Sequence, residues 1–269
     1  MIFDITTQEN AMRFICEFLG TTTDVVNDFL KANTICDWCI DTTNVTADNL
    51  AEYLCIDFNN LNATDIEAVG LHYTSNDDEC NSIKMLGLGD LQFAVNHETP
   101  LKIFLSDNGI TFNTQLMEMY SDGETFNIEY TTYQTDKPLT HIARKMYFDN
   151  QISCFFRVKD VTQYGGRVDR RPEFLFNLDN QFKKMNLSHQ WVKKSQSYEI
   201  KFQLPVNSFT GYTFYEDKDN HNSNNYRLAK SLVDLALSVV SLADRDEVFA
   251  YLKPTVVIGP QQILSIIKL

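Results

Sequence analysis

The residues with the clearest potential for ligand chemistry are His72 and Thr74, which lie in a segment rich in aromatic and β-branched residues. Residues 69–74 are predicted to form a β-strand, because such residues favour strands. A histidine at a strand end can donate a hydrogen bond to the hydroxyl groups of a ligand, and a hydroxyl two residues further on projects from the same face. His72 and Thr74 are therefore a candidate ligand site. A histidine that is hydrogen-bonded within the protein is the structural alternative.

The residues after this strand predict a helix and a turn. Residues 77–86 follow a helical pattern with Ile83 directed inward, and either Asn76 or Asp77 can cap the helix. Gly87-Leu88-Gly89 comes next, after a helix rather than a strand and without a third glycine. This pattern does not support the Gly-rich dinucleotide site of a Rossmann fold.

The order of strand, His-X-Thr, polar cap, helix and Gly-Leu turn between Leu71 and Leu91 resembles the opening of the ADP-ribosyltransferase fold. The resemblance is closest to the DNA-targeting ADP-ribosyltransferase toxins and the RNA 2′-phosphotransferases. Asp246-Glu247-Val248-Phe249, followed by residues 256–263, is similar to the closing strands of that fold and predicts strands at 247–252 and 256–258. The resemblance covers residues 69–95 and 198–267, and its two parts occur in the order that the fold requires.

The resemblance implies that NAD is the substrate and that ADP-ribose is transferred to a macromolecular target with release of nicotinamide. It implies that His72, Tyr73 and Thr74 bind NAD and that Glu247 is catalytic together with His72. Glu247 would hydrogen-bond the nicotinamide ribose, stabilise the positive charge that develops on the sugar, and orient or deprotonate the nucleophile. The polar loop at residues 216–225 would contact the target. The alternative for Glu247 is a charge on the exposed face of a strand.

Two further parts of such a site have several candidates. Arg144 and Arg157 are the arginines best placed to pair with the NAD phosphates. The aromatic residue that stacks on nicotinamide has four candidates, which are Tyr120, Tyr130, Tyr133 and Tyr147. A chain that kept the fold and lost the chemistry would show the same pattern.

The arrangement of predicted elements favours the α+β class. Residues 1–68 predict a small helical subdomain of three short helices, which begin near Gln8, near Thr23 and at Thr46. Residues 69–269 mix strands and helices without a regular βαβ repeat, so we expect one α+β domain of ADP-ribosyltransferase type with a mainly antiparallel sheet.

Cys36 and Cys39 form a Cys-X-X-Cys pair that could begin a zinc or redox site. A second pair is missing and the five histidines are scattered, so we expect no metal site and reduced, inert thiols. The N-terminus has no basic flank followed by an apolar run, and no stretch approaches about 18 apolar residues. We therefore expect a cytoplasmic protein without a membrane span.

The formal net charge of −13 suggests which partners the chain could bind. An acidic surface repels nucleic acid, so a protein target is favoured over a nucleic acid. A basic patch is possible among seven side chains, although a solvated surface explains them as well. These are Arg167, Arg170, Arg171, Lys183, Lys184, Lys193 and Lys194.

The charge also supports a rival function from another class. The chain could be a non-catalytic acidic binding or inhibitor protein, of phage or mobile-element origin, that occludes a basic nucleic-acid-binding site on a host factor. Clustered carboxylates such as Asp217 and Asp219 would then carry partner binding. Either function fits a toxin or a phage defence or anti-defence protein, and a plain structural subunit is a third possibility.

Overall fold

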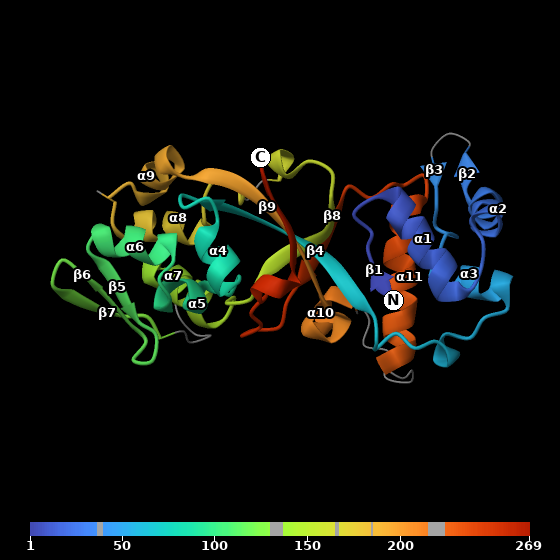
Figure 1. Ribbon diagram of the computed structural model, residues 1–269, viewed down its shortest axis with the longest axis horizontal. Coiled ribbons are helices and arrows are strands. Elements are labelled where there is room, and N and C mark those ends of the chain that lie inside the picture. Colours follow the sequence, from blue (N-terminus) through green and yellow to red (C-terminus); the bar gives the residue numbers. More distant parts are fainter. Residues whose placement is uncertain (37–39, 130–136, 165–166, 184, 215–223) are drawn as a thin grey trace. The chain divides into compact units, whose positions relative to one another are not determined.

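The structure is a computed structural model that describes residues 1–36, 40–129, 137–164, 167–183, 185–214 and 224–269 (Figure 1). Helices and a mainly antiparallel sheet confirm the α+β class. The chain divides into two compact units, each made of three segments. Unit 1 comprises Met1–Leu71, Ser153–Lys159 and Gln203–Tyr251, and unit 2 comprises His72–Ile152, Asp160–Phe202 and Leu252–Leu269.

The largest sheet has six strands, and its order is β10-β8-β4-β9-β11, with β1 paired to β4 outside this path. The pairs β10–β8, β8–β4 and β9–β11 are antiparallel, whereas β1 runs parallel to β4. Leu71 of β4 lies opposite Phe155 of β8, and Glu247 of β10 lies opposite Val158. The strands are β1 (Ile2–Phe3), β4 (Glu67–Asn76), β8 (Ser153–Val158), β9 (Gln196–Pro205), β10 (Glu247–Tyr251) and β11 (Ile263–Lys268).

Unit 1 contains the three N-terminal helices that the sequence predicts. Each begins after a threonine, and the side chains of Thr7, Thr22 and Thr46 accept a hydrogen bond from the backbone N–H three residues on. Its helices are α1 (Gln8–Leu19), α2 (Thr23–Asn33), α3 (Ala47–Leu54), α10 (Gly211–Phe214) and α11 (Asn224–Val240), with the short turns η1 (Phe58–Asn60) and η3 (Val206–Ser208) and the hairpin β2 (Ile35–Cys36) and β3 (Ile40–Asp41).

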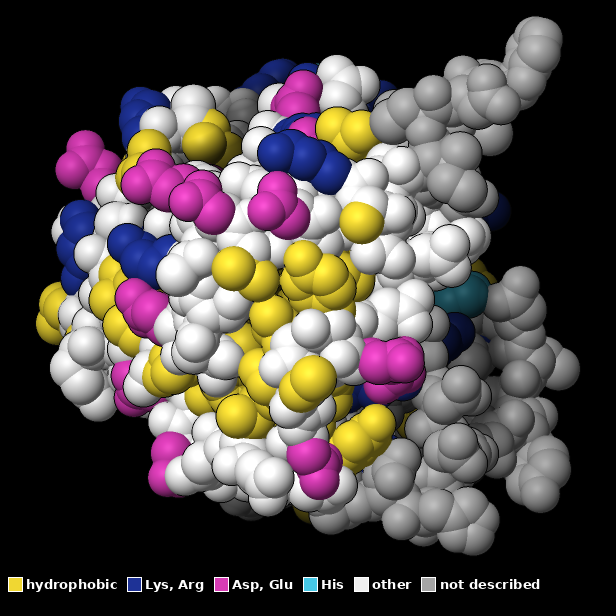
Figure 2. Space-filling view, turned by 90° about the vertical axis from the view of Figure 1, so that its right-hand side faces the viewer, with side chains coloured by type: hydrophobic (Ala, Val, Ile, Leu, Met, Phe, Trp, Pro, Cys, Tyr) yellow, Lys and Arg dark blue, Asp and Glu magenta, His cyan; other side chains and the backbone are white. Residues whose placement is uncertain are grey.

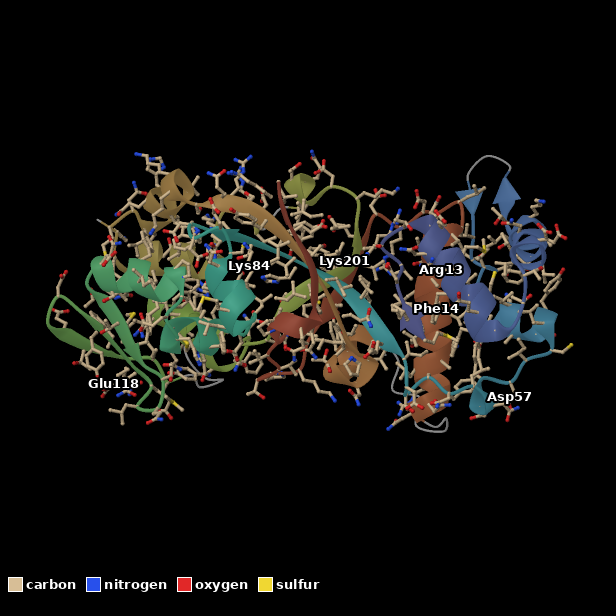
Figure 3. The ribbon with its side chains drawn as sticks, viewed as in Figure 1. Arg13, Phe14, Asp57, Lys84, Glu118 and Lys201 are labelled. Carbon is tan, nitrogen blue, oxygen red and sulfur yellow. The ribbon has the colours of Figure 1, made fainter. Side chains whose placement is uncertain are left out.

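The core of unit 1 is aromatic. Helices α1 and α11 lie side by side (Figure 1), and Phe14 of α1, labelled in Figure 3, meets the edge of Phe3 with ring centroids 5.0 Å apart. Phe3 in turn meets the edge of Phe156 at 5.2 Å. Edge-to-face pairs of this kind add about 1 kcal/mol to the burial of the rings. The rings thus join β1, α1 and β8, which are far apart in the sequence.

Unit 2 packs its helices around a buried tryptophan. Trp191 is 1% exposed, meets the ring of Phe104 at 5.2 Å, and donates its indole N–H to the hydroxyl of Ser75 at 2.7 Å. Its helices are α4 (Asn81–Leu86), α5 (Leu91–Asn96), α6 (Pro100–Asp107), α7 (Pro138–Tyr147), α8 (Glu173–Gln181) and α9 (Leu187–Lys194), with the turns η2 (Val161–Gln163) and η4 (Pro260–Gln262) and a small sheet of β5 (Ile110–Asn113), β6 (Glu118–Ser121) and β7 (Glu124–Asn127).

The prediction of a helix over residues 77–86 was wrong at its start, because α4 begins only at Asn81. The side-chain oxygen of Asn76 accepts hydrogen bonds from the backbone N–H groups of Asp78 and Cys80, at 2.8 and 3.0 Å. Asparagine competes in this way with helical hydrogen bonds. Glu79 and Cys80 adopt a positive φ of 57°, so the chain forms a turn before the helix.

The predicted strand at residues 256–258 was also wrong. Only Ile258 pairs there, in an isolated antiparallel bridge to Leu88 with hydrogen bonds of 2.9 and 2.8 Å. Gly87 has a φ of 87°, and a Cβ at this position would lie 2.3 Å from the carbonyl oxygen of Ile258. Gly87 therefore serves the close approach of two backbone segments within unit 2.

Candidate functional site

The residues predicted to bind NAD on β4 belong to unit 2 and project to both faces of the strand. His72 and Thr74 are partly buried, whereas Tyr73 between them is 7% exposed and points to the other face. The Tyr73 hydroxyl donates to the carboxylate of Glu199 at 2.6 Å. Burial, followed by this hydrogen bond, raises the pKa of Tyr73 well above its ordinary value. Tyr73 therefore already has a partner within unit 2.

Glu247 is the first residue of β10 and belongs to unit 1, where it is partly buried. The strand becomes irregular one residue further on, where the register with β8 shifts between Val248 and Phe249. Such a bulge re-aims the neighbouring side chains. His72 belongs to unit 2, so the two predicted catalytic residues are described within separate units, and their common site stays a prediction.

Arg157, one of the two predicted phosphate ligands, is held by groups of unit 1. It is 6% exposed, and its guanidinium donates to the carbonyl oxygens of Arg245 and Thr6 and to the carboxylate of Asp244, at 3.0, 3.1 and 3.0 Å. Lys159 contacts the same Asp244 carboxylate at 2.6 Å. These cations lower the pKa of Asp244, with the Lys159 hydrogen bond as the largest cause. The arrangement ties β8 to the segment before β10.

Arg144, the other predicted phosphate ligand, is exposed on α7 of unit 2. Its guanidinium carbon lies 6.0 Å from the ring centroid of Phe148, at the outer limit of a cation–π contact. Of the predicted stacking residues, Tyr147 donates to the carbonyl of Thr114 at 3.3 Å, and Tyr120 donates to Glu118. Tyr130 and Tyr133 lie outside the described residues, as do residues 216–223 of the predicted target loop, with Asp217 and Asp219, whereas its last two residues begin helix α11.

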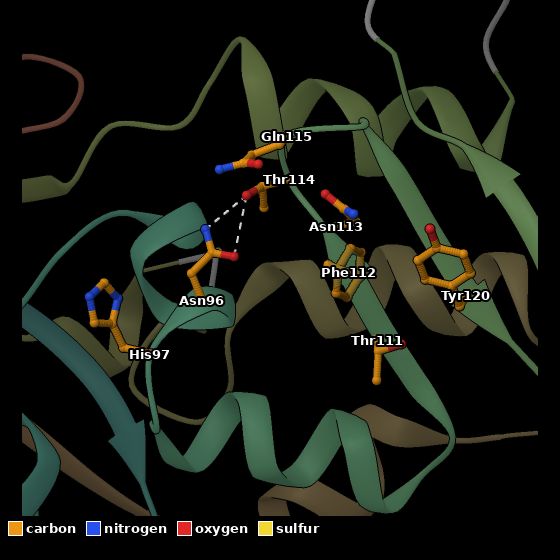
Figure 4. Close-up of a pocket in the computed structure, with 8 residues that line it drawn as sticks. All are labelled: Asn96, His97, Thr111, Phe112, Asn113, Thr114, Gln115 and Tyr120. Atoms are coloured by element: carbon orange, nitrogen blue, oxygen red, sulfur yellow. Dashed lines mark hydrogen bonds between the residues drawn. The ribbon is translucent and has the colours of Figure 1, made fainter.

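A pocket of about 640 Å³ opens in unit 2 between α5 and the sheet of β5 and β6 (Figure 4). The Asn96 amide and the Thr114 hydroxyl bond to each other in its wall, at 2.9 and 3.2 Å. None of the described residues that line it is Lys, Arg, Asp or Glu, so it offers hydrogen bonds to a neutral ligand but no countercharge for a diphosphate. The lining residues are Asn96, His97, Thr111, Phe112, Asn113, Thr114, Gln115 and Tyr120.

The described residues contain no group of three or more His, Cys, Asp or Glu side chains arranged to hold a metal ion. Cys39 of the Cys-X-X-Cys pair lies outside this part of the chain. Cys80 is buried in unit 2, and burial raises the pKa of its thiol to about 12, so the thiolate that would react or bind metal is disfavoured.

The acidic character of the chain is concentrated in one unit. Unit 1 has 19 acidic and 8 basic residues, a formal charge of −11, whereas unit 2 has 17 and 15, a formal charge of −2. Among the described residues of unit 1, seven exposed carboxylates have no cation within ion-pair distance. They are Glu9, Glu17, Asp24, Glu52, Asp57 (Figure 3), Asp65 and Glu67.

Sequence reasoning missed this acidic surface as a site because it counted charge over the whole chain. The signal was present in the first 71 residues, where 12 acidic residues stand against 2 basic ones. An unneutralised surface of this kind attracts cationic partners and repels polyanions. It cannot by itself perform bond chemistry, so its function would be recognition.

No helix among the described residues is both long and apolar enough to span a bilayer. Comparison of the chain with protein-family models, with curated proteins and with solved structures gave no match in any of the three.

Proposed function

We propose that this protein is a non-catalytic binding protein whose acidic unit 1 occupies a basic, nucleic-acid-binding surface of a partner protein. The single observation that carries the proposal is the separation of charge, −11 in unit 1 against −2 in unit 2. Carboxylates on a folded surface can take the place of phosphates against lysine and arginine, and their field accelerates the encounter of the two proteins.

The arrangement of charge supports this function because it is unfavourable for the fold itself. Glu17 lies in the last turn of α1 and Glu52 in the last turn of α3, and neither turn contains a basic residue. A negative charge at a helix C-terminus opposes the helix dipole by about 0.3–1 kcal/mol. Surface charges that do not serve stability are expected where they serve recognition.

The test is competition with DNA for purified basic DNA-binding proteins. Each protein is bound to labelled duplex DNA, and release of the DNA by the acidic protein is followed by fluorescence anisotropy. We expect release from at least one of them, with an affinity that falls steeply as salt rises. Absence of release from every protein at low salt would remove the proposal.

Two charge-matched variants assign the effect to unit 1. The first combines Asp24→Asn, Glu52→Gln and Asp65→Asn, and all three residues are exposed in unit 1. The second is the control in unit 2. It combines Asp107→Asn, Asp122→Asn and Glu124→Gln, which are equally exposed. We expect about tenfold weaker competition from the first and little change from the second. Equal losses would show that net charge alone acts.

A second candidate function is the ADP-ribosyl transfer that the sequence resemblance implies. The observation that favours it is that β4 and β10, the strands of His72 and Glu247, belong to one sheet with β8 between them. Incubation with NAD tests it directly, since a transferase releases nicotinamide and His72→Ala or Glu247→Gln would stop the release. A protein that neither binds NAD nor releases nicotinamide would exclude this function.

A further inference from the structure

Helices α2 and α3 of unit 1 present apolar side chains to solvent. Tyr53 of α3 is 51% exposed, and its ring lies 5.6 Å from that of Phe29 in α2. Leu30 and Leu54 are only partly buried. Figure 2 shows this side of the molecule, with apolar side chains gathered in its middle and acidic side chains, together with some basic ones, around them. Exposed apolar side chains that gather in this way indicate an interaction surface.

The acidic side chains of these two helices are arranged in pairs. Asp24 and Asp28 lie four residues apart on α2, and Asp48 and Glu52 lie four residues apart on α3. Like charges at this spacing are neighbours on a helix and destabilise it by about 0.2–0.5 kcal/mol per pair. All four carboxylates are exposed, and Asp24 and Asp48 lie in the first helical turn, where the helix dipole favours negative charge and offsets part of this repulsion.

Few cations neutralise these pairs. Lys31, the one basic residue of α2, lies 3.6 Å from Asp28, and Lys230 of α11 lies 2.5 Å from Asp48. Among the described residues, Asp24 and Glu52 have no cation within ion-pair distance. One carboxylate of each pair thus stays available for a positively charged group of a partner.

We propose that the α2–α3 surface, defined by the apolar side chains of Leu30, Tyr53 and Leu54 and by the exposed carboxylates Asp24 and Glu52 of the same two helices, docks a basic amphipathic helix of the partner protein. The apolar stripe of such a helix would cover Tyr53 and the leucines, and lysine or arginine beside the stripe would meet the two free carboxylates. This inference rests on the proposed function and names the surface and the partner chemistry that carry it. Apolar anchors in a charged surround are the usual arrangement where a helix is recognised.

The experiment measures binding of two synthetic lysine–leucine peptides to the full chain. In the first peptide the leucines recur every three or four residues and form one face, and in the second the same residues are scrambled. We expect the amphipathic peptide to bind about tenfold more tightly than the scrambled one. Equal affinities would overturn the docking face yet leave charge-driven binding by unit 1 intact, and absence of binding by both would remove the proposed function itself.

Three variants test where on unit 1 the amphipathic peptide binds. Tyr53→Ser should remove most of the preference for the amphipathic peptide, whereas Tyr212→Ser, which alters another exposed tyrosine of unit 1, should keep it. Glu52→Gln should weaken the binding of both peptides and reduce its salt dependence, without any loss of core packing, because Glu52 is exposed. Loss of preference in Tyr212→Ser alone would overturn the assignment. So would a dimer in sedimentation that Tyr53→Ser dissolves, because the face would then bind a second copy.

Discussion

Units 1 and 2 differ in their balance of acidic and basic residues. In unit 2, lysines neutralise carboxylates close to them in space, and Lys145 contacts Asp149 at 2.7 Å and Glu173 at 2.9 Å while Lys194 contacts Asp77 at 2.5 Å. In unit 1, Arg157 and Lys159 contact Asp244 and Lys230 contacts Asp48, but only 8 basic residues are available for 19 acidic ones.

The net charge of −13 is therefore not distributed evenly over the two units, which carry −11 and −2. Unit 2 is close to neutral because its 17 acidic residues are nearly balanced by 15 basic ones, although, among the described residues, exposed carboxylates such as Asp107 and Asp122 have no ion pair there either. Unit 1 retains repulsion that a few lysines would relieve. Unit 1, which carries most of the negative charge, is the unit to which we assign partner binding. Four measurements test whether binding and charge repulsion belong to unit 1 and not to unit 2.

The largest effect is expected from Trp191→Ala, which damages unit 2 and leaves every charge in place. The substitution removes a fully buried indole and its hydrogen bond to Ser75, so the free energy of unfolding should fall by about 4 kcal/mol in urea denaturation. Val192→Ala, next to it and 43% exposed, should cost far less. Binding of a cationic partner by the folded variant should be unchanged, and a loss as large as that of the unit 1 triple variant would contradict the division.

Asp244→Asn should have the next largest effect, because it removes the carboxylate that Arg157 and Lys159 share in unit 1. We expect a loss of about 2 kcal/mol, since the buried Arg157 loses its charged partner. The folded pKa of Asp244 lies below the ordinary 3.8, so its contribution is present above that pH and disappears as the pH falls through the lower folded value. The difference from wild type should thus shrink in acid. Asp246→Asn, whose side chain is 70% exposed, is the control and should cost little.

A smaller effect is expected from salt, which should stabilise unit 1 more than unit 2. Raising the ionic strength screens repulsion between exposed carboxylates, so the amides of unit 1 should gain protection equivalent to about 1 kcal/mol. The amides of unit 2 should change little, because its net charge is −2. Hydrogen exchange followed by mass spectrometry measures both in one sample. Equal gains in the two units would show that the charge difference has no energetic consequence.

The smallest change in stability is expected from substitutions at the C-terminal ends of two helices, one in each unit. Glu17→Lys in α1 and Asp107→Lys in α6 each replace an exposed acidic residue in the last turn of a helix without basic residues there. Each should stabilise the protein by about 0.5 kcal/mol through the helix dipole. Glu17→Lys should gain more at low salt, because it also relieves repulsion in unit 1, and the two gains should converge at high salt. A larger gain in stability from Asp107→Lys than from Glu17→Lys at low salt would contradict the assignment of charge repulsion to unit 1.

Local chemistry made several elements predictable. The helices α1, α2 and α3 follow from threonine caps and apolar residues at helical spacing, and both signals lie within a few residues of the helix they define. The error at residues 77–86 has a local cause as well. The Asn76 side chain accepts the backbone N–H of Cys80, which in a helix starting at residue 77 would bond to the Asn76 carbonyl, and Glu79 and Cys80 adopt a positive φ. The strand expected at 256–258 depended on a partner strand that the chain does not supply there.

Sequence alone determined the α+β class, the N-terminal helices and the total charge, because each follows from composition or from short-range spacing. Only the tertiary structure decided that this charge belongs mainly to unit 1, that Arg157 is held by Thr6, Arg245 and Asp244, and that Tyr73 donates to Glu199. These contacts join residues 87 to 151 positions apart, or 126 for Tyr73. Their formation depends on how the three segments of each unit pack, and no local pattern records that.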